Sequence, residues 1–214
     1  MLTGQPKNQL YGSGFVIGDG TYIVTNSHVV DKELDEGLLQ ELAVFTGKGP
    51  AAKVKMAKLI ANDEEHDIAI LKIEGRPLPA LKLANNDFRP EGTTIAFTGF
   101  PIGAVLGLYP VTHQGIIAAI TPTIIPVNDS RQISIAMLKR LRDPYLVYQL
   151  DATAYPGNSG SAMYDVTTGA VIGIINKVFV QQSKETVISK PSGITYAIPV
   201  KYLHKLLKQH KIKS

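Results

Sequence analysis

The sequence predicts an all-β protein, and three observations support that fold class. The 214-residue chain contains 19 Gly and 13 Pro, two of the residue types that most often form turns. Its hydrophobic residues, 44% of the total, fall in short runs between these turn formers, as in proteins built from many short strands. Bulky aromatic residues are scarce, with no Trp and only 6 Phe. A chain of this length can bury a sizeable core, as one large domain or two small ones.

The composition also excludes several kinds of chemistry. The chain has no Cys, so no disulfide stabilises it and no thiolate can act as a nucleophile. The formal net charge of +4 is modest and does not by itself indicate a nucleic-acid partner. No apolar run is long enough to span a bilayer, and residues 1–9 are polar. The histidines do not stand at ligand spacing with a suitable carboxylate, so we expect no metal and no cofactor.

Residues 1–88 are predicted to form a first β-rich domain that opens on a hairpin. Asp19-Gly20 is a strong two-residue turn signal between two β-rich runs. The glycines of the first run do not complete a dinucleotide-binding fingerprint, because no third glycine follows at the required spacing and no long helix comes next. Lysines alternate in the fourth run, which indicates a strand with one face in water. The predicted strands are residues 11–18, 21–25, 41–46, 51–60 and 68–73.

Residues 89–200 are predicted to form a second β-rich domain. Its strands are predicted at residues 93–99, 107–121, 171–180 and 193–200. Residues 122–144 break the strand pattern, because Asn128-Asp129-Ser130 can cap a helix and the apolar residues that follow fall near helical spacing. A surface helix covering a barrel edge fits this segment better than the alternative, a regulatory loop.

The last residues, 201–214, are predicted to form a basic amphipathic helix. Its apolar stripe is narrow and consists of Val200, Leu203, Leu206 and Leu207. We therefore expect this helix to pack on the core rather than on a membrane.

The sequence Tyr155-Pro156-Gly157-Asn158-Ser159-Gly160-Ser161-Ala162 places one serine between glycines. Glycines let the backbone make a tight, partly left-handed turn that directs successive N–H groups to one point and exposes the hydroxyl. Such a turn suits a nucleophile with an oxyanion hole. The donors would be the N–H groups of Gly157, Asn158 and Ser159, because Pro156 has none. The alternative is an ordinary Gly-Asn-Ser turn between two strands.

Two other residues could serve that serine. His28 stands where an apolar strand ends, so it can face a cleft, and Asp67 stands at the start of a buried strand. A turn carboxylate is the alternative for Asp67, although a partly buried carboxylate needs a partner. We expect its neighbour His66 to be solvated, and we consider His113 a rival base that lies within a strand. The order His, Asp, Ser differs from that of the α/β-hydrolases, whose histidine follows the serine.

Several motifs in this order resemble the protease domain of bacterial HtrA/Deg-type, trypsin-like serine proteases. The resemblance spans residues 12–200 and implies a chymotrypsin-like fold of two perpendicular six-stranded β-barrels with the active site between them. It also implies that His28 is the base, Asp67 the orienting acid and Ser159 the nucleophile. The motifs that carry it are Gly12-Ser13-Gly14-Phe15-Val16, residues 22–30 from Tyr22 to Val30, Asp67-Ile68-Ala69-Ile70-Leu71, Gly157-Asn158-Ser159-Gly160-Ser161 and Ile194-Thr195-Tyr196-Ala197-Ile198-Pro199.

The sequence also departs from the pattern of that family. Members usually carry one or two PDZ domains after the protease domain, which we do not expect here because the chain stops soon after Lys201. Family trimers form through aromatic residues of a longer N-terminal segment, whereas only Tyr11 precedes the first strand, so a homo-oligomer is left open and a trimer is not assigned. Ser161 replaces a usual glycine, and residues 121–145 are longer than expected. Asn158 is neutral, so no activating N-terminal amine is implied. The resemblance implies the cell envelope or periplasm, and a full-length chain would instead be cytoplasmic.

These residues predict a serine endopeptidase that cleaves unfolded or extended proteins through an acyl-enzyme. The substrate would lie against Ala154 and the strand around Ile175, Asn176 and Lys177, because an extended peptide pairs with a strand edge. The small Ala154 predicts a small or medium apolar side chain at the cleavage site, unless Lys177 selects an acidic one. The alternative function is a catalytically silent, peptide-binding or chaperone-like protein on the same fold.

Overall fold

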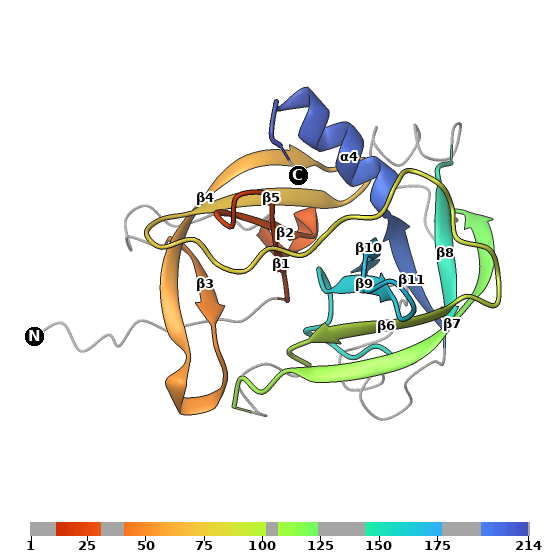
Figure 1. Cartoon of the computed structure of the whole chain (residues 1–214), viewed down its shortest axis with the longest axis horizontal. Coiled ribbons are helices and arrows are strands. Elements are labelled where there is room, and N and C mark those ends of the chain that lie inside the picture. Colours follow the sequence, from red (N-terminus) through yellow and green to blue (C-terminus); the bar gives the residue numbers. More distant parts are fainter. Residues whose placement is uncertain (1–11, 31–40, 102–106, 124–143, 177–193, 214) are drawn as a thin grey trace, which may run out of the picture.

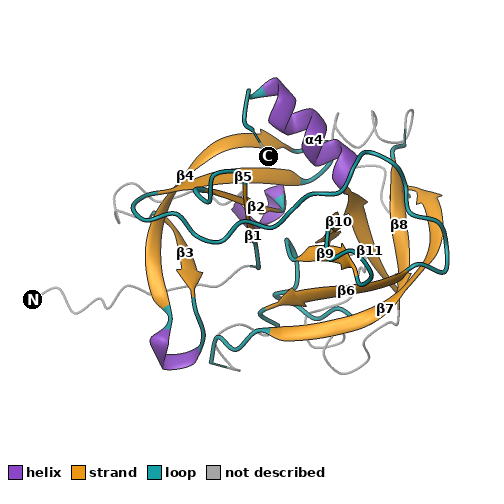
Figure 2. Cartoon of the chain, in the orientation of Figure 1, coloured by secondary structure: helices purple, strands orange, loops and turns teal. Residues whose placement is uncertain are grey.

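The computed structural model describes residues 12–30, 41–101, 107–123, 144–176 and 194–213. Strands dominate these residues and helices are few, as Figure 2 shows, so the predicted all-β class is confirmed. An N-terminal sheet and a C-terminal barrel lie side by side, with a C-terminal helix across one end of both (Figure 1). None of the described helices combines the length and the apolar character needed to cross a membrane.

The N-terminal sheet has five antiparallel strands in the order β1-β2-β5-β4-β3. Most residues of β4 are exposed and only Ala57 and Ala61 are buried, so the strand does not show the alternation of buried and exposed residues that its lysines predicted. Among the described residues of this half, no sixth strand joins β1 to β3 and the sheet is a half-barrel, so a sixth strand that closes it stays a prediction. The strands are β1 (Phe15–Ile17), β2 (Tyr22–Thr25), β3 (Leu42–Thr46), β4 (Lys53–Asp63) and β5 (Ile68–Ile73).

The C-terminal half is a closed barrel of six strands in the order β10-β11-β8-β7-β6-β9. Here the sequence-based prediction of a six-stranded barrel is confirmed. Its largest fully buried side chains include Phe97, Tyr148 and Met163, which fill the interior together with branched aliphatic residues. The strands are β6 (Thr94–Gly99), β7 (Val111–Pro122), β8 (Leu146–Asp151), β9 (Ala162–Asp165), β10 (Val171–Asn176) and β11 (Ile194–Pro199).

Three short helical elements complete the described chain: α1 (Ser27–Val30), the 3₁₀ turn η2 (Gly49–Ala51) and α4 (Val200–Gln209). As predicted, α4 buries Val200, Leu203, Leu206 and Leu207, and these residues belong to the main core cluster. The predicted surface helix at residues 122–144 lies almost entirely outside the described residues.

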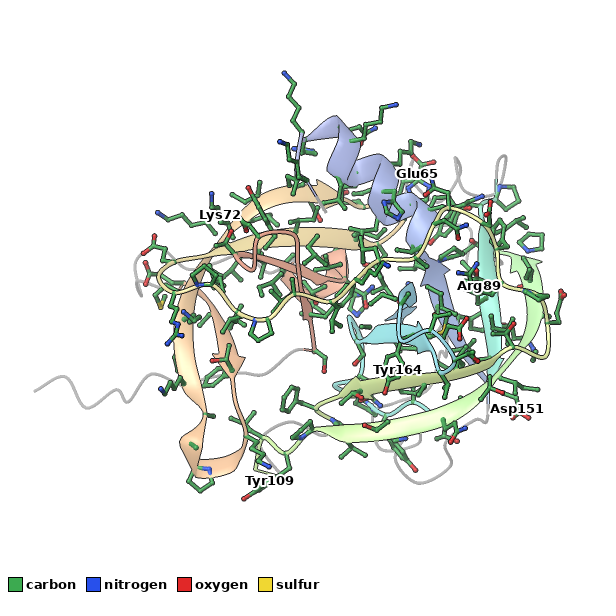
Figure 3. All side chains as sticks on the ribbon, in the orientation of Figure 1. Glu65, Lys72, Arg89, Tyr109, Asp151 and Tyr164 are labelled. Carbon is green, nitrogen blue, oxygen red and sulfur yellow. The ribbon has the colours of Figure 1, made fainter. Side chains whose placement is uncertain are left out.

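The two halves are joined by packing as well as by the chain. One core cluster contains Phe15 and Ile70 of the N-terminal sheet together with barrel residues such as Ile174. Between the halves, the segment 74–93 first follows the N-terminal sheet, where Leu81 N donates to Val16 O at 2.9 Å, and then the barrel, where Ala84 N donates to Val171 O at 2.8 Å. At the opposite end, Tyr109, labelled in Figure 3, lies against Gly49 in the β3–β4 hairpin. The boundaries 1–88, 89–200 and 201–214 stay predictions.

Candidate active site

His28 lies in α1, directly after β2. The strand ends at Thr25, and Val29 N donates to Asn26 O at 3.2 Å to start the helical turn. Val30, at the other end of the turn, is buried in the second core cluster, whereas the side chain of His28 is 41% exposed. The turn therefore buries its apolar end in the sheet and presents the imidazole to solvent.

Asp67 reaches His28 because of the register of two strands. Thr25 of β2 pairs with Ala69 of β5, so the residues just after 25 and just before 69 are neighbours. Asp67 has a left-handed backbone, with φ of 55°, in the turn that leads into β5. That conformation is uncommon for a residue with a side chain, although Asp tolerates it better than most.

Both carboxylate oxygens of Asp67 contact His28. Oδ2 lies 2.7 Å from His28 Nδ1, and Oδ1 accepts a hydrogen bond of 2.8 Å from the backbone N–H of His28. Asn26 Nδ2 donates to Asp67 O at 3.0 Å and ties the two strand ends together. With its side chain 15% exposed, Asp67 is mostly buried, as the sequence predicted. The arrangement fixes the plane of the imidazole and favours the tautomer with its proton on Nδ1.

The segment around Ser159 consists of two consecutive turns that share Asn158; we call residues 155–161 the serine loop. Asn158 N donates to Tyr155 O and Ser161 N donates to Asn158 O, each at 3.0 Å. Pro156 and Gly157 occupy the central positions of the first turn, and Gly157 has φ of 101°. Proline followed by a residue of positive φ is typical of a type II turn, which explains why glycine stands at 157.

The hydrogen bonds of the serine loop leave two N–H groups free. Within the described part of the chain, neither Gly157 N–H nor Ser159 N–H has an acceptor, whereas the N–H groups of Asn158, Gly160 and Ser161 each have one. The prediction that Asn158 contributes to an oxyanion hole is therefore corrected: Tyr155 O occupies its N–H. The two free donors, Gly157 N–H and Ser159 N–H, belong to the residues on either side of Asn158.

The serine loop is attached to both halves of the molecule. On the barrel side, Gly160 N donates to Ile175 O at 2.8 Å and Ile175 N to Ser161 O at 2.9 Å. On the other side, Ser13 N donates to Ser159 O at 2.7 Å. A Cβ on Gly160, whose φ is 86°, would collide with Ser13 O and Thr25 Oγ1, so this close approach requires glycine.

The same contacts bring Ser159 near α1. A Cβ on Gly12 would lie 2.7 Å from a methyl group of Val29 and 2.8 Å from Ser159 O, so Val29 and Ser159 both lie close to this glycine. Val29 is the neighbour of His28 in α1. The Ser159 hydroxyl and His28 Nε2, both in the described residues, form no hydrogen bond, and Ser159 is only 3% exposed. In structures without substrate such catalytic hydrogen bonds are often long and tighten only in the complex.

The residues expected to contact substrate differ in burial and in the hydrogen bonds that they form. Ala154 is half-buried and packs against the main core cluster. Ile175 is fully buried and both of its backbone polar groups bond to the serine loop, so it supports that loop and offers no backbone group to a peptide. Asn176 is half-buried at the end of β10, and Lys177 lies outside the described residues. The contact of these residues with substrate stays a prediction.

His66, expected to be solvated, is buried instead, with 5% exposure. Its Nδ1 lies 2.8 Å from Asp63 Oδ2, and its ring stacks on Tyr202 of α4 at 4.4 Å. The turn between β4 and β5, marked by Glu65 in Figure 3, is thereby fixed against α4. The pKa of Asp63 is lowered, because burial, which raises it, is outweighed by hydrogen bonds from His66. The expectation that His66 is solvated was wrong, because the ring of Tyr202 covers it and Tyr202 is too distant in sequence for a local pattern to show this.

His113, the rival base, lies in β7 and stacks on its strand partner Phe97 at 5.0 Å. Its Nε2 is buried without a hydrogen-bond partner among the described residues, and burial lowers the pKa of its imidazole. No hydrogen bond joins it to a carboxylate in that part of the chain, so it lacks the orienting group that His28 has. The described residues also contain no cluster of side chains able to hold a metal ion.

Comparisons with known proteins agree with this geometry. A family model described as a trypsin-like peptidase domain matches residues 12–174. A probable periplasmic serine endoprotease of the DegP-like type from Pseudomonas savastanoi is 32% identical over 197 residues, covering 92% of this chain and 34% of that protein. A protein of the same description from Halomonas elongata is 33% identical, covering 88% and 32% respectively. This chain therefore spans about a third of the length of these relatives.

Solved structures give the same result. The HtrA-type protease AlgW with a decapeptide has a TM-score of 0.69 and 27% identity, over 94% of this chain and 51% of that one. A serine endoprotease from Yersinia pestis has a TM-score of 0.66 and 25% identity, over 97% and 60%. The resemblance to HtrA/Deg-type proteases that the motifs indicated is confirmed.

Proposed function

This chain belongs to the trypsin-like peptidase domain family, and on that basis we propose that it is a serine endopeptidase acting on unfolded or extended proteins. Its relatives are described as serine endoproteases, and one solved neighbour holds a decapeptide. The observation that carries the proposal is the pair formed by His28 and Asp67, with Nδ1 and Oδ2 2.7 Å apart and the backbone of His28 bonded to the other carboxylate oxygen.

Asp67 and His28 would supply the general base. Asp67 accepts a hydrogen bond from the N–H at Nδ1 and so keeps the proton there, which leaves the lone pair of Nε2 free to take the hydroxyl proton of Ser159. The charge of the imidazolium that results is stabilised by the carboxylate. His28 then returns the proton to the leaving amine.

Ser159 would attack the scissile carbonyl and form an acyl-enzyme, which water then hydrolyses. The negative charge on the tetrahedral oxygen needs donors that are already in place. The free N–H groups of Gly157 and Ser159 are suited to this role, because folding of the serine loop leaves them without acceptors among the described residues. Each such donor contributes about 10²–10³ in turnover in enzymes of this kind.

A peptide substrate would pair with the chain from the last residue of β10 onward. Both backbone groups of Ile175 are hydrogen-bonded to the serine loop, so pairing would begin after it, at Asn176 and Lys177. Ala154 would form the wall for the side chain before the scissile bond, which predicts a small or medium apolar residue at that position.

Covalent labelling tests this function. A fluorophosphonate should label the wild type and not Ser159→Ala, and casein hydrolysis should fall by about 10⁶-fold in that variant, the loss known for a serine triad. The thermal midpoint of both proteins shows whether Ser159→Ala is folded. A drop of less than tenfold would reject Ser159 as the nucleophile.

A catalytically silent, peptide-binding or chaperone-like protein is the alternative on the same fold, since the Ser159 hydroxyl is not bonded to His28. Such a protein would bind casein, remain unlabelled even with peptide activators, and bind equally well as Ser159→Ala. That result would overturn the enzymatic proposal.

A further inference from the structure

Ser13 lies in the extended segment before β1 and reaches the serine loop from the other half of the molecule. It is 6% exposed, and all of its polar atoms form hydrogen bonds. Two of these bonds go to the serine loop: Ser13 N donates to Ser159 O and Ser13 Oγ donates to Gly157 O, both at 2.7 Å. One residue therefore binds the carbonyl groups of the two residues whose N–H groups are free.

Ser13 is itself held in place by two further elements. Thr25 Oγ1, at the end of β2, donates to Ser13 O at 2.7 Å. Phe100 N, directly after β6, donates to Ser13 Oγ at 2.9 Å. Because Oγ accepts from Phe100, its own proton is directed to Gly157 O. The hydrogen bond from Phe100 therefore orients the hydroxyl toward the serine loop.

One of these bonds constrains Gly157, the glycine that carries the first of the two donors. Gly157 has φ of 101°, and glycine can take either sign of φ at little cost. The ring of Pro156, the preceding residue, fixes only its own φ. The ring does not fix the orientation of the peptide plane between Pro156 and Gly157. The bond from Ser13 holds the carbonyl on the other side of Gly157, so it opposes any rotation of Gly157 that swings this carbonyl away.

The bond to Ser159 O acts in a similar way on the second donor. Asn158 O accepts from Ser161 N, so the trans peptide that follows directs Ser159 N–H the opposite way. Ser13 N holds the next carbonyl along the chain, that of Ser159. The nucleophile is therefore held on both sides of its Cα.

We propose that Ser13 is a positioning residue for the oxyanion hole, holding the carbonyl groups of Gly157 and Ser159 so that their N–H groups face the substrate. This inference rests on the proposed peptidase function. Ser13 does not touch the substrate in this role and acts only through the serine loop. The competing explanation is that the Ser13 hydroxyl only stabilises the fold.

The test compares Ser13→Ala with Thr123→Val. Thr123 is also buried, and its hydroxyl also donates to a backbone carbonyl, that of Tyr145, but it is not bonded to the serine loop. Ser13→Ala loses two hydrogen bonds of the hydroxyl, one to Gly157 O and one from Phe100 N, and Thr123→Val loses one, so a larger fall in thermal midpoint is expected for Ser13→Ala. For Ser13→Ala we expect kcat to fall about 10- to 100-fold with KM unchanged, less than the loss on removing an oxyanion donor outright. Thr123→Val should keep kcat within about twofold of the wild type.

Two binding measurements separate positioning from stability. A peptide boronic acid, which bonds to the serine and places an oxygen in the hole, should bind Ser13→Ala weaker by the same factor as the fall in kcat/KM. A substrate peptide should bind Ser13→Ala/Ser159→Ala and Ser159→Ala equally well. If Ser13→Ala does not fold, it is replaced by Ser13→Cys, whose somewhat larger thiol donates more weakly, with the same expected pattern and a smaller factor.

Three outcomes would overturn the inference. The first is wild-type kcat in the folded Ser13 variant, and the second is a loss confined to KM or to peptide binding. The third is an equal loss of kcat in Thr123→Val. A wild type that cleaves no protein and reacts with no fluorophosphonate would instead overturn the peptidase proposal, and this inference with it.

Discussion

The two sides of the candidate site are held by different kinds of hydrogen bond. In the N-terminal sheet, the Asp67 side chain fixes His28, through one bond to the imidazole and one to the backbone. In the barrel, the serine loop is held mainly by backbone groups, those of Tyr155, Asn158 and Ile175, and by Ser13 from the other half. The base should therefore be most sensitive to side-chain substitutions, and the serine loop to changes in backbone conformation.

Replacing the base should give the largest effect. His28→Ala should lower kcat/KM by about 10⁶-fold, as much as Ser159→Ala, because the serine then has no proton acceptor. His113→Ala is the matched control, since it also removes an imidazole but leaves the pair of His28 and Asp67 intact. A large loss in His113→Ala together with a small one in His28→Ala would reverse the assignment.

Asp67→Asn separates the two bonds of the carboxylate. The amide oxygen can still accept the backbone N–H of His28, but the amide nitrogen then faces Nδ1 as a donor and moves the imidazole proton to Nε2. In that tautomer His28 cannot accept the serine proton. We expect kcat to fall about 10⁴-fold with KM little changed, the loss known for this substitution in a Ser-His-Asp triad. A fall of less than tenfold would show that Asp67 does not set the tautomer.

The sequence predicted the His28 side of the site well because its geometry is local. Both residues stand at ends of apolar runs, and pairing of β2 with β5 in register brings those ends together. The buried face of α4 also follows from periodicity, whereas the closed barrel was implied by the resemblance to HtrA/Deg-type proteases. Each of these features depends on residues close together in sequence or on strand pairing.

The serine loop and its surroundings were predicted less completely, because their partners are distant. The N–H of Asn158 is not free, because it closes the turn whose central residues are Pro156 and Gly157. The sequence could have shown this, since in a proline-glycine turn the residue after the glycine usually donates to the residue before the proline. Ser13 stood in one of the motifs, but no local pattern gave it a role, because its partners in the serine loop follow more than a hundred residues later. His66 was misjudged for the same reason, because Tyr202 covers it.

A change in backbone conformation should act on the serine loop through stability as well as activity. Gly160→Ala introduces a Cβ at φ of 86° that would collide with Ser13 O and Thr25 Oγ1. Gly92→Ala is the matched control, with φ of 82° and no atom within 4 Å of the added Cβ. We expect the control to lose about 1–2 kcal/mol of unfolding free energy, from backbone strain alone. Gly160→Ala should lose about 1–3 kcal/mol more, from overpacking, and most of its activity.

Urea unfolding of the two variants, with casein hydrolysis beside it, measures both effects. If Gly160→Ala and Gly92→Ala were equally stable and equally active, the close contact between Ser13 and the serine loop would not exist in solution. A stable but inactive Gly160→Ala would show that the serine loop can move without unfolding the barrel, which would sharpen the contrast with the His28 side.

The smallest effect concerns pH and the barrel. Burial lowers the pKa of His113 below its ordinary value of 6.5, so the unfolded chain takes up a proton at a higher pH than the folded one. Between these two pKa values the unfolded state binds more protons, and stability therefore falls as the pH drops below about 6.5. His113→Leu removes this contribution while keeping an apolar group against Phe97. The unfolding free energy from urea titrations should consequently fall less between pH 7.5 and 5.5 in His113→Leu than in the wild type. An equal fall in both proteins would assign the acid sensitivity to other groups, and the ring of His113 would then be hydrated in solution.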